Sequence, residues 1–248
     1  MKPEQYKIMF ELEDNHWWYS GMRQITDAIL SQIHTNGHPL SILDAGCGTG
    51  AELAHLEKYG KVTGLDISEY ALSFCTKRGQ LNALNASITE LHFKDNSFDL
   101  VTSFDVIYHL WVEEDRRALR EMWRVLKPGG RLLLRVSAYQ FLTGPHDQAV
   151  YTRERYTSKK VATRLRDAGF TIEKLTYANT LLFPLAGAVR LLARFGIGKR
   201  QSALKSSSGP VNKALRHVLA IEAGLISRMD LPFGLSIICL ARKNEQSS

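Results

Sequence analysis

The feature that most constrains the fold of this chain is a glycine-rich loop placed between an apolar stretch and a helical pattern. Residues 40–43 are apolar, the loop reads Asp44-Ala45-Gly46-Cys47-Gly48-Thr49-Gly50, and residues 51–59 have the pattern of a helix. Glycines at such a turn let the backbone approach a ligand closely, and the first amides of the helix can hydrogen-bond it. The sequence therefore predicts a strand–loop–helix unit that binds a ligand.

The alternation of strand and helix patterns continues to residue 136. Further strands are expected at residues 62–65, 98–103 and 131–136. Helices are expected at residues 5–13, 21–33, 51–59, 68–78 and 114–126, the first two separated by the aromatic run His16-Trp17-Trp18-Tyr19. Such alternation is typical of a parallel sheet with helices on both faces, so the predicted fold class is α/β.

The pattern changes after residue 136. A polar loop at 137–157 is followed by an expected helix at 158–168 and expected strands at 170–177 and 234–242. Residues 181–230 look inserted, as two apolar helical patches joined by a loose linker at 205–210. We therefore expect three parts, namely residues 1–35, a core of residues 36–180 and 231–248, and an insertion of residues 181–230.

Composition excludes several classes of protein. With 44% hydrophobic and 23% charged residues in 248, the chain is globular and not disordered. Cys47, Cys75 and Cys239 form no CxxC pair, so we expect neither a disulfide framework nor a zinc site, which fits a reducing compartment. We expect no signal peptide and no membrane span, and hence a cytoplasmic protein that is either free or peripheral to the inner membrane face.

The positive charge lies in the C-terminal half. The formal net charge is +7, and residues 131–248 hold 19 basic and 7 acidic side chains. Within the insertion, residues 181–195 are apolar nearly all round, with Arg190 and Arg194 on one stripe. A basic face attracts the phosphates of nucleic acid, lipid or substrate, or is simply solvated. The insertion is accordingly packed core, a cap over an acceptor pocket, or a surface that docks on an anionic membrane.

Two kinds of ligand suit the glycine loop, and neighbouring residues distinguish between them. A loop of this kind followed by an acidic residue, here Asp66 at the end of the next strand, is also found where NAD binds. Asp44, however, would repel a pyrophosphate and could pair with an ammonium group. The third glycine of the loop, Gly50, is also two positions after Gly48, whereas the dinucleotide-binding pattern has its third glycine three positions after the second. These features favour a ligand that carries a ribose and an amino group.

Four sequence blocks resemble those of the class I S-adenosylmethionine-dependent methyltransferases, in the family's order and spacing over residues 40–137. They are Leu43-Asp44-Ala45-Gly46-Cys47-Gly48-Thr49-Gly50, Gly64-Leu65-Asp66-Ile67-Ser68, Phe98-Asp99-Leu100-Val101 and Leu126-Lys127-Pro128-Gly129-Gly130. The resemblance implies a Rossmann-like, mostly parallel sheet of seven strands with the last strand antiparallel. It also implies that S-adenosylmethionine binds at the carboxyl ends of the first strands.

The resemblance further implies which residues hold the cofactor. Asp66 would hold the ribose hydroxyls and Ile67 would pack on the adenine. Where relatives often have an aspartate that meets the adenine amine, this chain has Ser87, followed by Ile88. The implied cofactor-binding residues are Arg23, Asp44, Gly46, Gly48, Gly50, Asp66, Ile67, Ser87, Ile88 and Phe104.

Segments outside these blocks resemble a bacterial branch of the same family. They are His16-Trp17-Trp18-Tyr19-Ser20-Gly21-Met22-Arg23, Pro145-His146-Asp147, Arg155-Tyr156-Thr157 and Leu231-Pro232-Phe233-Gly234-Leu235-Ser236. By analogy, Arg23 would pair with the cofactor carboxylate. Residues 1–35 would form a helical lid in which Trp18 and Tyr19 cover the substrate. The alternative is that the tryptophans only fasten the N-terminal helix to the core.

The chemistry expected at the site needs few catalytic groups. A sulfonium already activates the methyl group, so the main task is to place a nucleophile in line. A hydroxyl or ammonium acceptor also needs a base, and histidine suits that role. The candidates are His146, which Asp147 would orient, and His109; their alternatives are loop structure and a helix cap. Arg155 and Tyr156 are expected to clamp the substrate or merely to begin the next helix.

Other chemistries lack their motifs. The chain has neither the Asp/Asn-Pro-Pro-aromatic run of the amino methyltransferases of nucleic acids nor the Pro-Cys pair of cytosine methyltransferases with a cysteine nucleophile, and it has no cluster with metal-ligand spacing. We therefore expect an enzyme that methylates oxygen or nitrogen of a small-molecule acceptor that is apolar, anionic or lipid-linked. The alternatives are an RNA methyltransferase, a NAD-dependent oxidoreductase and a non-catalytic partner subunit that binds S-adenosylmethionine.

Overall fold

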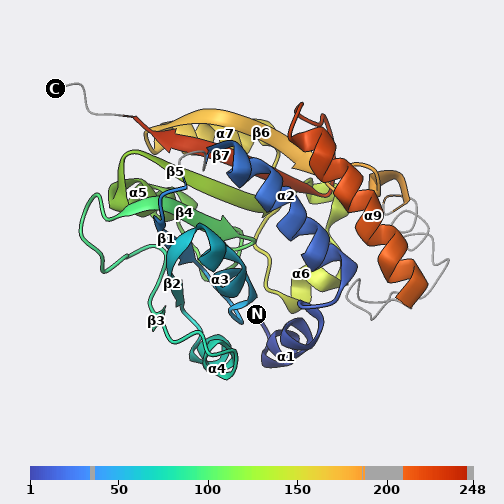
Figure 1. Cartoon of the computed structure of the whole chain (residues 1–248), viewed down its shortest axis with the longest axis horizontal. Coiled ribbons are helices and arrows are strands. Elements are labelled where there is room, and N and C mark those ends of the chain that lie inside the picture. Colours follow the sequence, from blue (N-terminus) through green and yellow to red (C-terminus); the bar gives the residue numbers. More distant parts are fainter. Residues whose placement is uncertain (34–36, 186, 188–208, 245–248) are drawn as a thin grey trace.

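The computed structural model of the chain describes residues 1–33, 37–185, 187 and 209–244, which are arranged around a sheet in the order β3-β2-β1-β4-β5-β7-β6 (Figure 1). The strands are β1 Leu40–Ala45, β2 Gly60–Asp66, β3 Ala83–Asn85, β4 Phe98–Phe104, β5 Leu126–Ser137, β6 Phe170–Ala178 and β7 Ser236–Lys243. β1 to β5 pair in parallel, and β7 is antiparallel to both β5 and β6. The predicted mostly parallel sheet of seven strands, with its last strand antiparallel, is confirmed.

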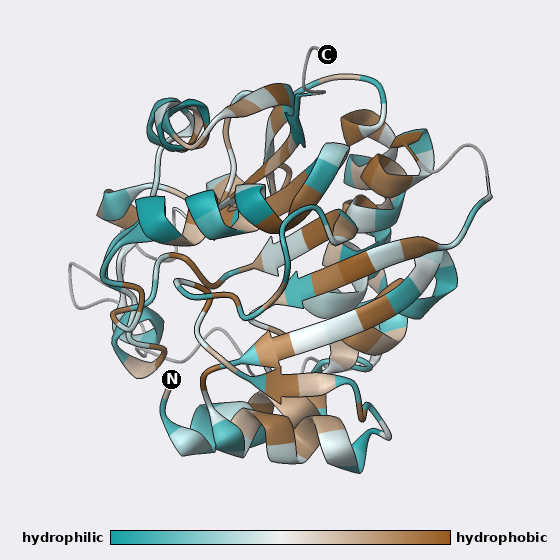
Figure 2. Cartoon of the chain, turned by 90° about the vertical axis from the view of Figure 1, so that its left-hand side faces the viewer, coloured by the Kyte–Doolittle hydropathy of each residue, from teal (hydrophilic) through white to brown (hydrophobic). Residues whose placement is uncertain are grey.

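Helices lie on both faces of this sheet. They are α1 Pro3–Leu12, α2 Trp17–Ile33, α3 Ala51–Leu56, α4 Glu69–Lys77, α5 Asp115–Val125, α6 Pro145–Ala149, α7 Ser158–Asp167 and α9 Gly209–Ile226, with 3-10 turns at Glu57–Tyr59 and Gln140–Leu142. One buried cluster joins α5 and α7 to the sheet, and a second joins α2, α3 and α9 to its other face. Figure 2 shows the resulting pattern, in which the strands are largely hydrophobic and the outer faces of the helices are polar.

The ends of several elements follow from local chemistry. The hydroxyl of Ser68 accepts a hydrogen bond from the amide of Ala71 at 3.2 Å and caps α4, as its position predicts. The aromatic run does not separate two helices, because Trp17 begins α2. The amide of Trp17 donates to the side chain of Asn212 in α9 at 2.7 Å, so a residue distant in sequence caps the helix. The short α6 lies within the expected polar loop at 137–157, and β3 lies where no element was expected.

Helix α9 is part of the layer that covers the sheet. Its residues Leu219, Ala223 and Ile226 are buried, and it packs along α2. Glu222 of α9 is also fully buried, and its carboxylate accepts the backbone amides of Asn179 and Leu181. The second predicted helical patch is therefore an integral element of this layer.

The rest of the insertion is only partly described. Arg190, Arg194, Lys199, Arg200 and the linker residues 205–208 lie outside the described residues. The separate insertion at 181–230 and its role as a cap stay predictions. None of the helices in the described ranges is long and apolar enough to cross a membrane.

Candidate functional site

A cavity of about 530 Å³ lies at the carboxyl ends of β1, β2 and β4. The strand order reverses between β1 and β4, which is where sheets of this kind leave a crevice for a ligand. Its lining includes the ends of these strands, at Asp44, Asp66 and Phe104, together with Met1 and the α1 residues Gln5, Tyr6 and Met9. The volume is within the range of small-molecule sites.

The glycine loop brings backbone to the wall of this cavity. Gly46 and Gly48 line it, with φ angles of 97° and 56°, a conformation that favours glycine. A Cβ at Gly46 would meet Val106 at 2.3 Å. Gly50 is outside the lining; its φ of 86° instead turns the chain into α3. Two of the three predicted glycines therefore form a close-fitting cradle, and the third shapes the turn behind it.

Asp66 ends β2 in a fixed orientation. Its two carboxylate oxygens accept the amides of Gly48 at 3.0 Å and Ser68 at 2.9 Å. Burial raises its pKa although these amides act in the opposite direction. Ile67 beside it is 55% exposed and lines the cavity together with Ser87 and Ile88. The arrangement fits a ribose at the carboxylate and a flat base against the apolar side chains.

Two further carboxyl groups line the same cavity. Asp44 is 2% exposed and accepts a hydrogen bond from the hydroxyl of Thr102 at 2.8 Å. Burial raises the pKa of Asp44 to about 7. Glu52 of α3 accepts Nε of Arg23 at 3.2 Å through one oxygen. This acidic wall can hold a ligand that carries an ammonium group and a sulfonium.

Arg23 does not reach the cavity wall. Besides Glu52, its guanidinium donates to the backbone carbonyl of Glu13 at 3.0 Å, and it is absent from the lining. Arg23 therefore binds Glu52 from outside the cavity lining. The resemblance instead implies a contact between Arg23 and the cofactor carboxylate.

The N-terminal segment lines the cavity and is fastened to the glycine loop. Trp18 and Tyr19 of α2 are part of the lining, and their role as a lid stays a prediction. Arg78, which follows α4, joins the segment to the loop, because it donates to Glu13 at 2.8 Å and to the carbonyl of Thr49 at 3.1 Å. Glu13 is 4% exposed and also accepts the hydroxyl of Thr49.

Both predicted histidines line the cavity. His109 lies in a turn after β4, and burial and the nearby amino terminus lower its pKa to about 4, so the imidazole is neutral at physiological pH. Its Nδ1 is buried without a hydrogen-bond partner among the described residues. His146 lies on α6. The carboxylate of Asp147 accepts Arg155 and the amide of Gly144, and the predicted orientation of His146 by Asp147 stays a prediction.

The two residues predicted to clamp the substrate, Arg155 and Tyr156, differ in whether they line the cavity. Arg155 lines the cavity, and each nitrogen of its guanidinium has a partner in the protein, namely Asp147 at 2.8 and 3.2 Å and the carbonyl of Ala138 at 3.0 Å. Tyr156 is completely buried away from the cavity, and its hydroxyl donates to Asp115 at 2.7 Å. Asp147, Arg155 and Tyr156 thus stabilise the wall of the site.

Sequence reasoning missed Arg135 of β5. This residue lines the cavity, is 5% exposed, and donates to Asp105 at 2.6 Å. The signal was present in the sequence, because an arginine interrupts the otherwise apolar run Leu132-Leu133-Leu134-Arg135-Val136. A buried strand carries a charged side chain only when a partner or ligand meets it.

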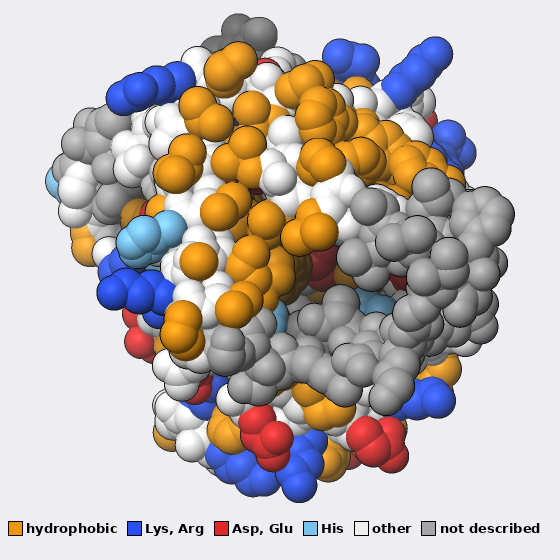
Figure 3. Space-filling model, turned by 90° about the vertical axis from the view of Figure 1, so that its right-hand side faces the viewer, with side chains coloured by type: hydrophobic (Ala, Val, Ile, Leu, Met, Phe, Trp, Pro, Cys, Tyr) orange, Lys and Arg blue, Asp and Glu red, His pale blue; other side chains and the backbone are white. Residues whose placement is uncertain are grey.

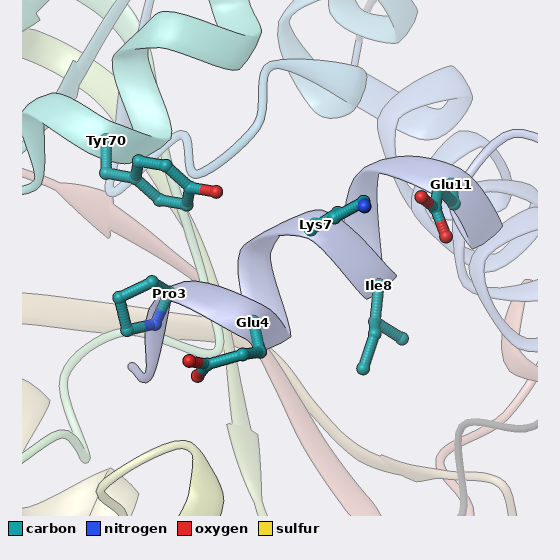
Figure 4. A pocket seen from close by; sticks show the side chains of 6 residues that line it. All are labelled: Pro3, Glu4, Lys7, Ile8, Glu11 and Tyr70. Atoms are coloured by element: carbon teal, nitrogen blue, oxygen red, sulfur yellow. The ribbon is translucent and has the colours of Figure 1, made fainter.

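A second hollow lies on the outer side of α1. It is lined by Pro3, Glu4, Lys7, Ile8, Glu11 and Tyr70 (Figure 4). Its charged side chains are exposed to solvent, and it contains none of the residues described above. Within the described part of the chain, no group of three or more His, Cys, Asp or Glu side chains could hold a metal ion.

Comparisons with known proteins agree with this geometry. Residues 43–134 match the model of a family described as a methyltransferase domain. The chain is 32% identical over 142 residues to phosphoethanolamine N-methyltransferase 1 of Arabidopsis thaliana, covering 52% of this chain and 28% of the plant protein. It is 29% identical over 191 residues to a protein of Mycolicibacterium smegmatis named as a probable S-adenosylmethionine-dependent methyltransferase, covering 74% of this chain and 69% of that one.

A solved structure shows the same fold. Phosphoethanolamine N-methyltransferase 2 of Haemonchus contortus, in complex with S-adenosyl-L-methionine, superposes with a TM-score of 0.58 at 18% identity, covering 88% of this chain and 52% of that one. The chain spans less than half the length of the first curated relatives that it matches, 28% and 44%.

Proposed function

We propose that the chain is a class I S-adenosylmethionine-dependent methyltransferase that transfers the methyl group of this cofactor to a small-molecule acceptor, as the methyltransferase-domain match over residues 43–134 supports. The observation that carries the proposal is the cavity itself, in which the glycine cradle and Asp66 share one enclosed space with histidine and aromatic side chains. When bound, the cofactor supplies an activated methyl group, and the protein supplies the orientation of the acceptor.

The lining supports an acceptor with an apolar body. Beyond the glycine cradle, the cavity is bordered by Trp18, Tyr108, Trp111, Val112 and Val150. Glu13, Asp44, Glu52, Asp66 and Asp105 also line it, against the two arginines Arg135 and Arg155. An excess of carboxylates repels the phosphates of a nucleic acid, so this wall favours a small acceptor over RNA.

We assign the role of general base to His109. Its imidazole is neutral because burial lowers its pKa to about 4, it lines the cavity, and its Nδ1 has no hydrogen-bond partner among the described residues. Such a group can take a proton from a hydroxyl or ammonium acceptor. His146 then contributes to the wall that positions the acceptor.

The experiment is a transfer assay with methyl-labelled S-adenosylmethionine against a panel of small amines, phenols, carboxylic acids and lipid extracts. We expect labelled product together with S-adenosylhomocysteine from at least one apolar acceptor. Binding of S-adenosylhomocysteine without turnover on any acceptor would favour the non-catalytic partner subunit. Failure to bind S-adenosylhomocysteine would overturn the proposal altogether.

The role of His109 is tested on the acceptor so identified. In His109→Gln, turnover should fall by about 10²- to 10⁴-fold while the affinity for S-adenosylhomocysteine changes little, since only proton transfer is lost. The matched control is His92→Gln, because the side chain of His92 is 77% exposed outside the cavity. A larger loss in His146→Gln than in His109→Gln would move the role to His146.

A further inference from the structure

Arg135 has a hydrogen-bond donor that no described residue accepts. The residue lies in β5 and lines the cavity, and its Nε donates to Asp105 at 2.6 Å. Its Nη1 is buried and has no hydrogen-bond partner among the residues that the structure describes. Leaving a donor of a buried charge unpaired is unfavourable, and a ligand that pairs with the guanidinium recovers this cost. The guanidinium is therefore a candidate ligand contact at the cavity wall.

The guanidinium of Arg135 is held in a fixed position. Its central carbon lies 5.1 Å from the ring centroid of Trp18 and 4.8 Å from that of Phe104, and both rings also line the cavity. Aromatic faces attract a guanidinium and leave its edge available for hydrogen bonds. A group fixed in this way loses little further freedom when it binds an anion.

The surroundings of Arg135 carry the opposite charge. Burial acts against its charge, but the carboxylates of Asp105 and Glu52 keep its pKa above the ordinary value. Asp44 also interacts electrostatically with Arg135. One end of the cavity thus presents carboxylates and a guanidinium together, which complements a zwitterion, the ammonium facing the carboxylates and the carboxylate facing the guanidinium.

We propose that Arg135 binds the α-carboxylate of the methionine moiety of the cofactor. The inference rests on the proposed function, and it takes Arg135 in place of Arg23, because Arg135 lines the cavity and Arg23 does not, although Nη2 of Arg23 is also buried without a hydrogen-bond partner among the described residues. Arg135 is then a specificity-determining residue, because it distinguishes S-adenosylmethionine from analogues without the carboxylate.

The test compares two ligands that differ only in this group. Wild-type protein and Arg135→Met are titrated calorimetrically with S-adenosylmethionine and with decarboxylated S-adenosylmethionine. In the variant, S-adenosylmethionine should bind about ten- to hundredfold more weakly. The affinity for the decarboxylated ligand should stay within about threefold or improve, since a cation beside a dicationic ligand is removed.

Two further variants complete the experiment. The matched control is Arg131→Met on the same strand, whose side chain pairs with Glu173 at 2.7 Å on the surface; neither affinity should change. Arg135→Lys keeps a charge beside Asp105, so it tests the proposal if Arg135→Met does not fold. Its discrimination between the ligands should lie between those of wild type and Arg135→Met.

Two results would overturn the inference while the proposed function stands. One is an equal loss of affinity for both ligands in Arg135→Met and Arg135→Lys. The other is an unchanged affinity for S-adenosylmethionine, which would indicate that Arg135 contacts the acceptor instead of the cofactor. If the wild-type protein binds neither ligand, the proposed function fails with it, so the two failures are distinguishable.

Discussion

At the scale of single residues, Asp44 shows how a binding site costs stability. Burial raises its pKa to about 7, whereas an exposed aspartate has a pKa of 3.8. Between these values the folded protein binds more protons than the unfolded chain, so protonation of Asp44 favours the folded state. This contribution to the free energy of unfolding is complete below pH 3.8 and is lost as the pH rises through 7. The loss amounts to about 4 kcal/mol. A bound ammonium group removes this penalty by pairing with the carboxylate.

Asp44→Asn should therefore stabilise the protein and weaken cofactor binding. At pH 8 we expect the free energy of unfolding in urea to rise by about 2–4 kcal/mol. The affinity of wild type for S-adenosylhomocysteine should increase from pH 6 to pH 8, because binding releases the proton of Asp44, and the variant should lack this dependence. Asp167→Asn on the surface is the control. Equal wild-type affinities at both pH values would contradict the prediction.

Sequence reasoning identified the residues that belong to a contiguous motif. Gly46, Gly48, Asp66, Ile67, Ser87 and Ile88 all line the cavity, and the cofactor contacts that the resemblance implies for them stay predictions. The sequence is less informative where the position of a side chain depends on partners from distant segments. Arg23 and Arg135 are both arginines near carboxylates, and only the packing of α2 against β5 decides which of them reaches the cavity.

At the scale of elements, the contact between α2 and α9 depends on a glycine. A Cβ at Gly21 of α2 would meet Leu219 of α9, with Cδ1 at 2.2 Å and Cβ at 2.6 Å. The second atom is close to the backbone and cannot move without shifting α9. The glycine therefore sets how closely the two helices approach.

We expect Gly21→Ala to lower the free energy of unfolding by about 1–3 kcal/mol through overpacking. Gly224→Ala is the matched control on α9, since nothing lies within 4 Å of its Cβ position. That variant should be neutral or slightly stabilising, because alanine favours the helix. Urea unfolding of both proteins gives the comparison, and equal stabilities would show that α9 adjusts without cost.

The sequence predicted long periodic elements well and short ones poorly. α5 was recognised because Leu119, Met122 and Trp123 recur at helical spacing, and it ends within one residue of the expected position. β3 was missed because Ala83, Leu84 and Asn85 form a short, partly exposed edge strand without alternation.

At the scale of the whole molecule, one face carries exposed apolar side chains. Figure 3 shows hydrophobic side chains gathered there. Ring contacts link Tyr139 to Phe141 and Phe183, and Phe183 to Phe233; Phe141 is 59% exposed and Phe233 41%. Arg190, Arg194, Lys199 and Arg200 follow Phe183 in sequence and lie outside the described residues. Docking of the insertion on an anionic membrane, one of the three readings of its sequence, stays a prediction.

Cosedimentation with vesicles tests this prediction. Native protein should bind anionic vesicles more strongly at low salt than at high salt, and neutral vesicles weakly. Replacing Arg190, Arg194, Lys199 and Arg200 by Glu should abolish the salt-sensitive part, and Phe141→Ser should weaken what remains. Absence of binding by the native protein would leave the insertion as a cap over a dissolved acceptor.

The attachment of α1 has a kinetic consequence. Arg78 joins the carbonyl of Phe10 and the carboxylates of Glu13 and Asp14 to the carbonyl of Thr49. Since these bonds share one guanidinium, we expect them to break together, and the helix that lines the cavity to detach in a single event. Exchange of spent for fresh cofactor is then a first-order process, and its rate sets an upper limit on turnover however much acceptor is supplied.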